Sequence, residues 1–379
     1  MKGTLELSYY LDNAATTKPY QEVVDIVADV MMKYYGNPSS AHKLGEESRR
    51  IIEKVRDQVA KDINCDPIEV IFTSGAAEAN ALAYTAKVGR EVVSTNLEHK
   101  SIELLNKHTN CFIKSDKFGN IDLDDLERTL RLLKNIRLTA FVSIHGANSE
   151  IGVIQNIKAI SNIVHKYDGI LHVDATQLYP ERRINVKDLD IDLMSVSAQK
   201  FGGGRGAGFL YVKKGTRMHS IIPGTQEMGR RGGTYNTPAI AGMGKALEII
   251  RRQKSHNKTV RRIRNSLAEK LLSIEGVFLN GPKLDGNRLC NNLSLRIDGI
   301  QASDLVAMAS LYGIYISAGS ACSSGEAVPS STLKAIGLTD EEALSTIRIT
   351  VGDDLSEDNI NHITTMISAL ISELRNRKD

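Results

Sequence analysis

The apolar positions of this chain alternate between the spacing of helices and the spacing of strands. In residues 19–36 and 45–63, apolar side chains recur every three or four residues, as in amphipathic helices. The first helix is predicted to bury one face made of Val23, Ile26, Val27, Val30 and Met31. Short runs rich in β-branched residues predict strands at 70–74, 91–95, 138–144, 170–175, 193–197 and 208–212. Because helix-like segments separate most of the earlier runs, we predict an α/β fold with a mainly parallel central sheet and helices on both faces.

The pattern changes near residue 250. Long helical segments come first, then predicted strands at 291–297 and 345–351, and then a closing helix at 355–375. This order predicts a smaller α+β domain. We therefore divide the chain into a large domain of residues 15–250, a small domain of residues 251–379, and an N-terminal segment of residues 1–14 that packs with the small domain.

Composition and charge narrow the class of protein. The chain has 379 residues, of which 41% are hydrophobic and 25% charged, and its net charge is only +3. These values are ordinary for a globular protein and do not favour nucleic acid as a partner. No apolar run reaches the length of a membrane helix, and the start of the chain lacks the apolar core of a signal peptide. We expect a cytoplasmic protein that has no membrane partner.

One segment stands out for its charge. The run RRQKSHNKTVRRIR (251–264) is strongly basic. We interpret it as the solvated face of a helix near the domain junction rather than as a patch for tRNA or an acidic partner.

The four cysteines do not form a metal-binding pattern. No two of them have the C-x-x-C spacing, so we expect no metal site. We interpret Cys65, Cys111 and Cys290 as small hydrophobic residues or inert thiols. Cys322 differs because it lies in SAGSACSSG (317–325), a stretch of small residues that has no acid or base beside the sulfur.

Two polar groups follow predicted strands and together suggest a cofactor. Asp174, in HVDATQ (172–177), ends a buried strand at the position where parallel sheets bind ligands. Lys200, in SVSAQKFGGG (195–204), follows another strand and enters a glycine-rich turn. Pyridoxal phosphate needs an amine to which its aldehyde attaches and a carboxylate that keeps its ring nitrogen protonated. A buried salt bridge between Asp and Lys would give the same pattern.

A third motif could bind the phosphate of such a cofactor. The stretch FTSGAAEAN (72–80) predicts a strand, a turn of small residues and the start of a helix. Free backbone N–H groups and the positive end of the helix make such a turn an anion site. An ordinary turn between a strand and a helix has the same composition.

Taken with these motifs, nearly the whole chain resembles the pyridoxal-phosphate-dependent cysteine desulfurases of the class V aminotransferase group. The matching stretches are LDNAATT (11–17), YGNPSSAH (35–42), TSGAAEAN (73–80), EHKS (98–101), NSEIGV (148–153), HVDATQ (172–177), SAQK (197–200), QEMGRRGGTYN (226–236), SAGSACSSG (317–325) and STIRITVG (345–352). The spacing from Cys322 through Pro329 to Leu338 resembles the long-loop subgroup that serves iron–sulfur cluster assembly and tRNA thiolation. The resemblance implies PLP fold type I, with the cofactor in the large domain.

The resemblance also implies the reaction. L-Cysteine would become L-alanine, and its sulfur would pass as a persulfide to Cys322 on a mobile loop of the small domain. Lys200 would attach the cofactor and take the α-proton, while Asp174 holds the ring nitrogen. Gln177 would bind the phenolic oxygen, and His99 would stack on the ring and assist proton transfer.

The remaining roles concern the phosphate and the substrate carboxylate. Phosphate contacts would come from Gly75, Ala76, Ala77 and Ser197, and from Thr234 of a second subunit, which implies a homodimer. The substrate-binding residues would be Arg348, Asn148 and Ser149. From the residues alone, His99 could also be a buried histidine with satisfied hydrogen bonds, Arg348 a surface ion-pair partner, and Thr234 a turn cap.

Some positions depart from the family pattern. Ala77, Ser149 and Gln199 stand where the family usually has Thr, Asn and His, and the turn 202–205 reads GGGR. These changes bear on cofactor affinity, turnover and substrate preference rather than on the reaction type. The sulfur acceptor would be a scaffold protein or a thiolation enzyme. The alternatives are a related lyase or aminotransferase acting on selenocysteine or another amino acid, or a weakly active sulfur-transfer partner protein.

Overall fold

The computed structural model describes residues 8–107, 109, 111–253, 255–319 and 328–377. The helices are α1 Gln21–Lys33, α2 Lys43–Ile63, α3 Ala76–Ala83, α4 Lys100–Glu103, α5 Leu123–Asn135, α6 Ile157–Lys166, α7 Val186–Leu189, α8 Thr237–Arg252, α9 His256–Leu272, α10 Ala302–Leu311, α11 Ser331–Ala335, α12 Asp340–Leu344 and α13 Glu357–Asn376. The strands are β1 Tyr9–Tyr10, β2 Val70–Thr73, β3 Glu91–Thr95, β4 Cys111–Ile113, β5 Ala140–His145, β6 Ile170–Asp174, β7 Leu193–Ser197, β8 Gly208–Val212, β9 Val277–Leu279, β10 Asn292–Ile297, β11 Ile314–Tyr315, β12 Ser317–Ala318 and β13 Thr346–Thr350.

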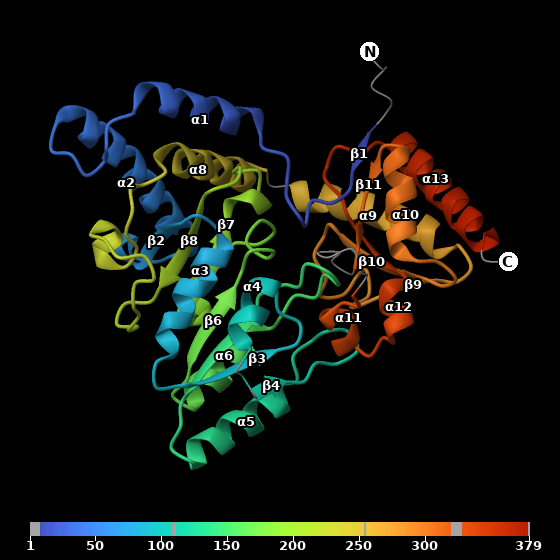
Figure 1. Ribbon diagram of the computed structural model, residues 1–379, viewed down its shortest axis with the longest axis horizontal. Helices are drawn as coiled ribbons and strands as arrows, with labels where there is room; N and C mark the ends of the chain where they lie inside the picture. Colours follow the sequence, from blue (N-terminus) through green and yellow to red (C-terminus); the bar gives the residue numbers. More distant parts are fainter. Residues whose placement is uncertain (1–7, 108, 110, 254, 320–327, 378–379) are drawn as a thin grey trace.

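A seven-stranded sheet forms the centre of the larger part, with strand order β2-β8-β7-β6-β5-β3-β4 (Figure 1). Strand β8 runs antiparallel to both of its neighbours, and the other pairs are parallel. The predicted mainly parallel α/β fold is therefore confirmed, and all six predicted strands of this part form. Because β5, β6 and β7 are adjacent and parallel, their carboxyl ends meet at one edge of the sheet.

Successive residues of the central strands point to opposite faces, and each face packs on its own helices. Phe72, Val93 and Val142 belong to one buried cluster, which also takes in residues of α2, α5, α6 and α8. Their neighbours Ile71, Val92 and Phe141 belong to a second cluster with residues of α3 and α4. This alternation explains why near-continuous apolar runs form strands that are buried on both sides.

The smaller part is built on a four-stranded antiparallel sheet, β12-β13-β10-β9. Its core is shared by α9, α10 and α13, which lie beside that sheet in Figure 1. The start of the described chain belongs to the same core, since Tyr9 and Leu11 are buried in it and β1 pairs with β11 in parallel. The predicted strands 291–297 and 345–351 and the closing helix correspond to β10, β13 and α13.

Two details of the sequence interpretation are wrong. Met31 is 62% exposed, although it was predicted on the buried face of its helix. The basic run is not a uniformly solvated face, because Arg264 on α9 is fully buried and its Nη2 donates to the Leu284 carbonyl at 2.7 Å. Within the described residues, no helix combines the length and apolar character that crossing a membrane requires.

Candidate active site

Lys200 and Asp174 lie at the same edge of the central sheet. Asp174 is the last residue of β6, and Lys200 ends the 3-10 turn Ala198–Lys200 that directly follows β7. The Lys200 Nζ donates hydrogen bonds to the carbonyls of Ala14, at 2.8 Å, and Ala15, at 2.6 Å. Gln177 Nε2 donates to the same Ala14 carbonyl at 2.9 Å. The N-terminal segment therefore holds the side chains of Lys200 and Gln177 side by side.

Burial disfavours the charged form of the Lys200 amine, and the positive charge of Arg348 acts in the same direction. The carboxylates of Asp174 and Asp12 oppose this effect, but the net result lowers the pKa of Lys200 to about 8. A lysine with such a pKa supplies a neutral, nucleophilic amine near neutral pH.

This electrostatic setting leads to a testable pH dependence. In cofactor-free protein, we expect the rate at which pyridoxal phosphate is attached to Lys200 to rise about tenfold per pH unit up to a midpoint near pH 8, because the neutral amine is the reactive form. Borohydride trapping followed by mass spectrometry measures the rate. Arg348→Met should move the midpoint upward, because it removes a cation. A midpoint near that of a free lysine in the unmodified protein would contradict the assignment.

The Asp174 carboxylate is buried and held by two neutral donors. The Thr176 backbone N–H donates to Oδ1 at 3.0 Å, and Asn80 Nδ2 donates to Oδ2 at 2.9 Å. Together they fix the plane of the carboxylate. An ionised carboxylate has about four lone-pair positions, so Asp174 keeps acceptor capacity for a further N–H.

The turn between β2 and α3 brings its backbone next to Ser197. Gly75 has φ +155° and ψ −174°, a conformation that is essentially restricted to glycine. A Cβ on Gly75 would lie 3.4 Å from Ser197 Oγ, and a Cβ on Gly208 would lie 2.8 Å from Gly75 Cα. Ala76 and Ala77 begin α3, where first-turn N–H groups are free of intrahelical partners. The predicted phosphate turn thus has the backbone and the hydroxyl of an anion site.

An ion pair that sequence reasoning missed lies beside this turn. Glu78 Oε2 accepts from the Ser74 N–H at 2.7 Å, and Glu78 Oε1 accepts from Arg231 Nε at 2.6 Å. Arg231 thereby ties the segment that contains Thr234 to the start of α3 in the same chain. Thr234 itself is exposed.

Arg348, in β13, faces the same region from the smaller part of the protein. Its Nη2 donates to Asp12 Oδ1 at 2.7 Å, while its buried Nε has no partner among the described residues. The pair is largely shielded from solvent, with 14% of the Arg348 side chain and 19% of the Asp12 side chain exposed. Asp12 thus orients the guanidinium and leaves one edge of it available to a carboxylate.

Asn148 and Ser149, which the resemblance predicts as substrate-binding residues, lie in a turn that the Asn148 side chain closes. Asn148 Nδ2 donates to the Leu97 carbonyl at 2.9 Å, and its Oδ1 accepts from the N–H groups of Glu150 and Ile151 at 2.8 and 2.9 Å. The amide of Asn148 is therefore engaged in holding its own turn. The Ser149 carbonyl accepts from Asn292 Nδ2 at 3.4 Å. Their role in binding a substrate carboxylate stays a prediction.

Glu150 is a buried acid that the sequence interpretation did not single out. Burial raises its pKa to about 7, against the opposing effects of the Ser330 hydroxyl and Arg348. Its Oε2 accepts from Ser330 Oγ at 2.6 Å, and a Cβ on Gly319 would lie 2.8 Å from its Oε1. Cys322 itself lies outside the described residues, between these two contacts in sequence.

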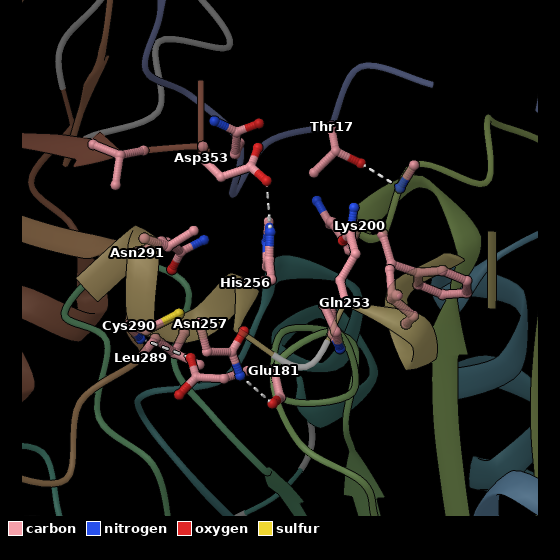
Figure 2. A pocket seen from close by; sticks show the side chains of 18 of the residues that line it. Thr17, Glu181, Lys200, Gln253, His256, Asn257, Leu289, Cys290, Asn291 and Asp353 are labelled. Carbon is pink, nitrogen blue, oxygen red and sulfur yellow. Dashed lines mark hydrogen bonds and ion pairs between the residues drawn. The ribbon is translucent and has the colours of Figure 1, made fainter. Parts of the chain in front are cut away.

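His99 lies at the start of α4 and is exposed, so it is not a buried histidine. Its Nδ1 accepts from the Ser101 N–H at 3.1 Å and lies 2.8 Å from Ser101 Oγ. Lys200 also lines a cleft of about 710 Å³ between the two parts of the protein. Figure 2 shows that Lys200 and Cys290 line this same cleft.

Sequence analysis missed the roles of Asn80 and Asp12, although the sequence carries a signal at each of these positions. Asn80 is the polar member of the run NALA in α3 and is fully buried. A buried amide must find hydrogen-bond partners, which marks such a position as a candidate for the site. Asp12 is part of the quoted LDNAATT stretch, but its partner Arg348 is 336 residues away in sequence.

Comparison with known proteins places the chain in a family. The family described as aminotransferase class-V matches residues 9–363. A protein named cysteine desulfurase IscS, from Dictyoglomus turgidum (strain DSM 6724 / Z-1310), is 36% identical over 97% of this chain and 95% of its own length.

Solved structures lead to the same group. A NifS-like protein has a TM-score of 0.88 and 31% identity, and the match covers 97% of this chain and 100% of that protein. A structure described as SspA in complex with cysteine has a TM-score of 0.78 and 28% identity, over 91% of this chain and 99% of that one. With a family match over most of its length and a relative this similar over nearly all of it, the chain belongs to the aminotransferase class-V family, in the group of the cysteine desulfurases.

Proposed function

We propose that this protein is a pyridoxal-phosphate-dependent cysteine desulfurase that converts L-cysteine to L-alanine. The observation that carries the proposal is the meeting of three groups where the carboxyl edge of the central sheet faces the smaller part of the protein. An amine with a lowered pKa, Lys200, lies in the field of a buried carboxylate, Asp174, and of a guanidinium with a free edge, Arg348. The names of the relatives and the cysteine bound to SspA support L-cysteine as the substrate.

The groups present at the site fit pyridoxal phosphate. Lys200 is suited to attach the aldehyde, and Asp174 has acceptor capacity for the ring N–H. Gly75, Ala76 and Ala77, with Ser197, offer N–H and hydroxyl donors to the phosphate. When bound, the cofactor supplies an electron-accepting ring for the chemistry at the substrate's α-carbon. Ala77 has no side-chain hydroxyl, so it would contact the phosphate through its backbone N–H alone.

The chain's own residues then have the following roles in the proposed mechanism. Arg348 binds the substrate carboxylate through the edge that Asp12 leaves free. Lys200 Nζ, in its neutral form, accepts the α-proton and later returns a proton to carbon. Gln177 and His99 orient the reacting groups from the two sides of the site.

Sulfur transfer needs a thiol nucleophile, which we assign to Cys322. Its thiolate attacks the sulfur of the substrate, so an S–S bond forms as the C–S bond breaks. The carbon keeps the bonding electron pair and takes a proton, which gives alanine and a persulfide on Cys322. A second thiol, on an acceptor protein such as a scaffold or a thiolation enzyme, would then receive this sulfur.

We further propose a homodimer in which Thr234 reaches the partner's phosphate turn. Thr234 is exposed in the single chain, and Arg231 holds its segment next to α3, where a second subunit could receive it. Sedimentation equilibrium of the purified protein tests this point, and an active monomer would contradict it.

The function is tested on the purified protein loaded with pyridoxal phosphate and supplied with L-cysteine and a reductant. We expect alanine and sulfide in equal amounts, because one C–S bond is broken for each alanine formed. D-Cysteine is the matched control, since Arg348 and Lys200 can serve only one stereoisomer together. Pyruvate in place of alanine would indicate a lyase, and a keto acid without sulfide would indicate an aminotransferase. Either result would refute the proposal.

A further inference from the structure

A chain of three hydrogen bonds joins Asp174 to His99. Asn80 Nδ2, on α3, lies 2.9 Å from Asp174 Oδ2 and 3.0 Å from Ser101 Oγ, on α4. Ser101 Oγ in turn lies 2.8 Å from His99 Nδ1. The two side chains expected to contact the cofactor ring are thus connected through two residues that have no assigned role.

The chemistry of each group fixes the direction of this chain. An amide nitrogen only donates, so Asn80 gives one hydrogen to the carboxylate of Asp174 and the other to the Ser101 hydroxyl. Because that hydroxyl oxygen already accepts, its own hydrogen is free to point at His99 Nδ1. The reverse orientation of the amide would set Asn80 Oδ1 against the carboxylate, so Asp174 selects the observed one.

The His99 ring therefore has one preferred tautomer. Its Nδ1 accepts from the Ser101 hydroxyl and also from the Ser101 backbone N–H at 3.1 Å. A nitrogen that faces two donors carries a lone pair, so the proton of the neutral ring lies on Nε2. The Nε2–H can donate a hydrogen bond but cannot accept a proton.

We propose that Asn80 and Ser101 are positioning residues that hold His99 as the Nε2–H tautomer, so that His99 acts as a hydrogen-bond donor and leaves the α-proton to Lys200. The role of His99 toward the substrate rests on the proposed desulfurase function. The tautomer does not depend on that function, because every atom of the chain of hydrogen bonds belongs to the protein. His99, which by resemblance would stack on the ring and assist proton transfer, would thus assist by donating a hydrogen bond.

The test is ¹⁵N NMR of the histidine side chains, in cofactor-free and in loaded protein, with His99 assigned by comparison with His99→Gln. We expect an unprotonated, hydrogen-bonded Nδ1 and a protonated Nε2 in both forms. In Ser101→Ala the ring can rotate away from the backbone N–H, so the Nδ1 signal should shift toward an average of the two tautomers. Ser101→Thr keeps the hydroxyl and should restore the original signal.

His172 provides a control within the same spectra. Its two ring nitrogens lie 2.9 Å from the hydroxyls of Ser143 and Ser195, so its signals should be the same in both Ser101 variants. A protonated Nδ1 on His99 in the unmodified protein, or a Ser101→Ala spectrum identical to it, would overturn the proposal. Failure to form alanine would refute the desulfurase function and leave this NMR result standing.

Discussion

Replacing Lys200 with alanine will abolish the formation of alanine and sulfide, a loss of roughly a thousandfold or more. The change removes both the amine that attaches the cofactor and the base that takes the α-proton. It also removes two hydrogen bonds to the carbonyls of Ala14 and Ala15. The visible absorption of the attached cofactor should disappear, and borohydride treatment should no longer add the cofactor's mass to the protein.

Two further variants make this result specific. Lys213 follows the neighbouring strand β8, and its Nζ pairs with Asp190 Oδ1 at 2.6 Å outside the site. Lys213→Ala should therefore keep the absorption and most of the activity. Lys200→Arg keeps a positive charge but cannot attach the aldehyde or act as a base near neutral pH, so it should behave like Lys200→Ala. Turnover above about one per cent in Lys200→Ala would contradict the mechanism.

The positions of Lys200 and Asp174 could be predicted because they depend only on the order of strands. Asp174 ends β6 and Lys200 lies in the turn directly after β7, and parallel neighbours such as these place their carboxyl ends at one edge of the sheet. The turn at Gly75 could be predicted for a different reason. Its backbone conformation is restricted to glycine, so the sequence must have a glycine at this position. These features are local, and the fold brings them together.

The connections between these residues could not be predicted in the same way. Asn80 contacts Asp174, 94 residues away in sequence, because α3 packs on strands β6, β7 and β8. The sequence marks Asn80 as a buried polar group but does not name its partner. The ion pair of Asp12 and Arg348 depends on how the start of the chain crosses from the smaller part of the protein to the larger one. The spacing of apolar residues along the chain does not predict that crossing.

The error at Met31 has a packing cause. Helix α1 packs on α8, and Gly242 of α8 allows a close approach, since a Cβ there would lie 2.7 Å from Val27 and 3.3 Å from Val23. A helix that packs on one other helix buries only a narrow stripe. Apolar side chains beside that stripe, such as Met31, stay in contact with solvent.

Replacing Cys322 with alanine is expected to leave cofactor binding intact and to lower sulfide release at least about a hundredfold. The other three thiols are poor nucleophiles near neutral pH. Burial, with Glu69 and Asp66, raises the pKa of Cys65 to about 12. Burial also raises the pKa of Cys111, and burial together with Glu181 raises that of Cys290 well above its usual range. The thiolate is the reactive form, so these surroundings leave little of it.

The chain length between Ser317 and Cys322 is compatible with the proposed nucleophile. Ser317 lies directly opposite Arg348 in the pairing of β12 with β13. Five residues of chain span at most about 17 Å, so the sulfur of Cys322 can approach a substrate whose carboxylate is bound by Arg348. The purified Cys322→Ala variant should therefore keep the visible absorption of the loaded protein while sulfide, measured with L-cysteine and a reductant, is lost.

Cys290→Ala is the matched control, because Cys290 lines the same cleft as Lys200 (Figure 2). We expect its sulfide release to equal that of the unmodified protein, since a buried thiol beside Glu181 stays protonated. The opposite pattern, with activity lost in Cys290→Ala and kept in Cys322→Ala, would assign the nucleophile to Cys290. Sulfur transfer would then occur in the cleft that Lys200 and Cys290 both line, and the persulfide would form next to Glu181.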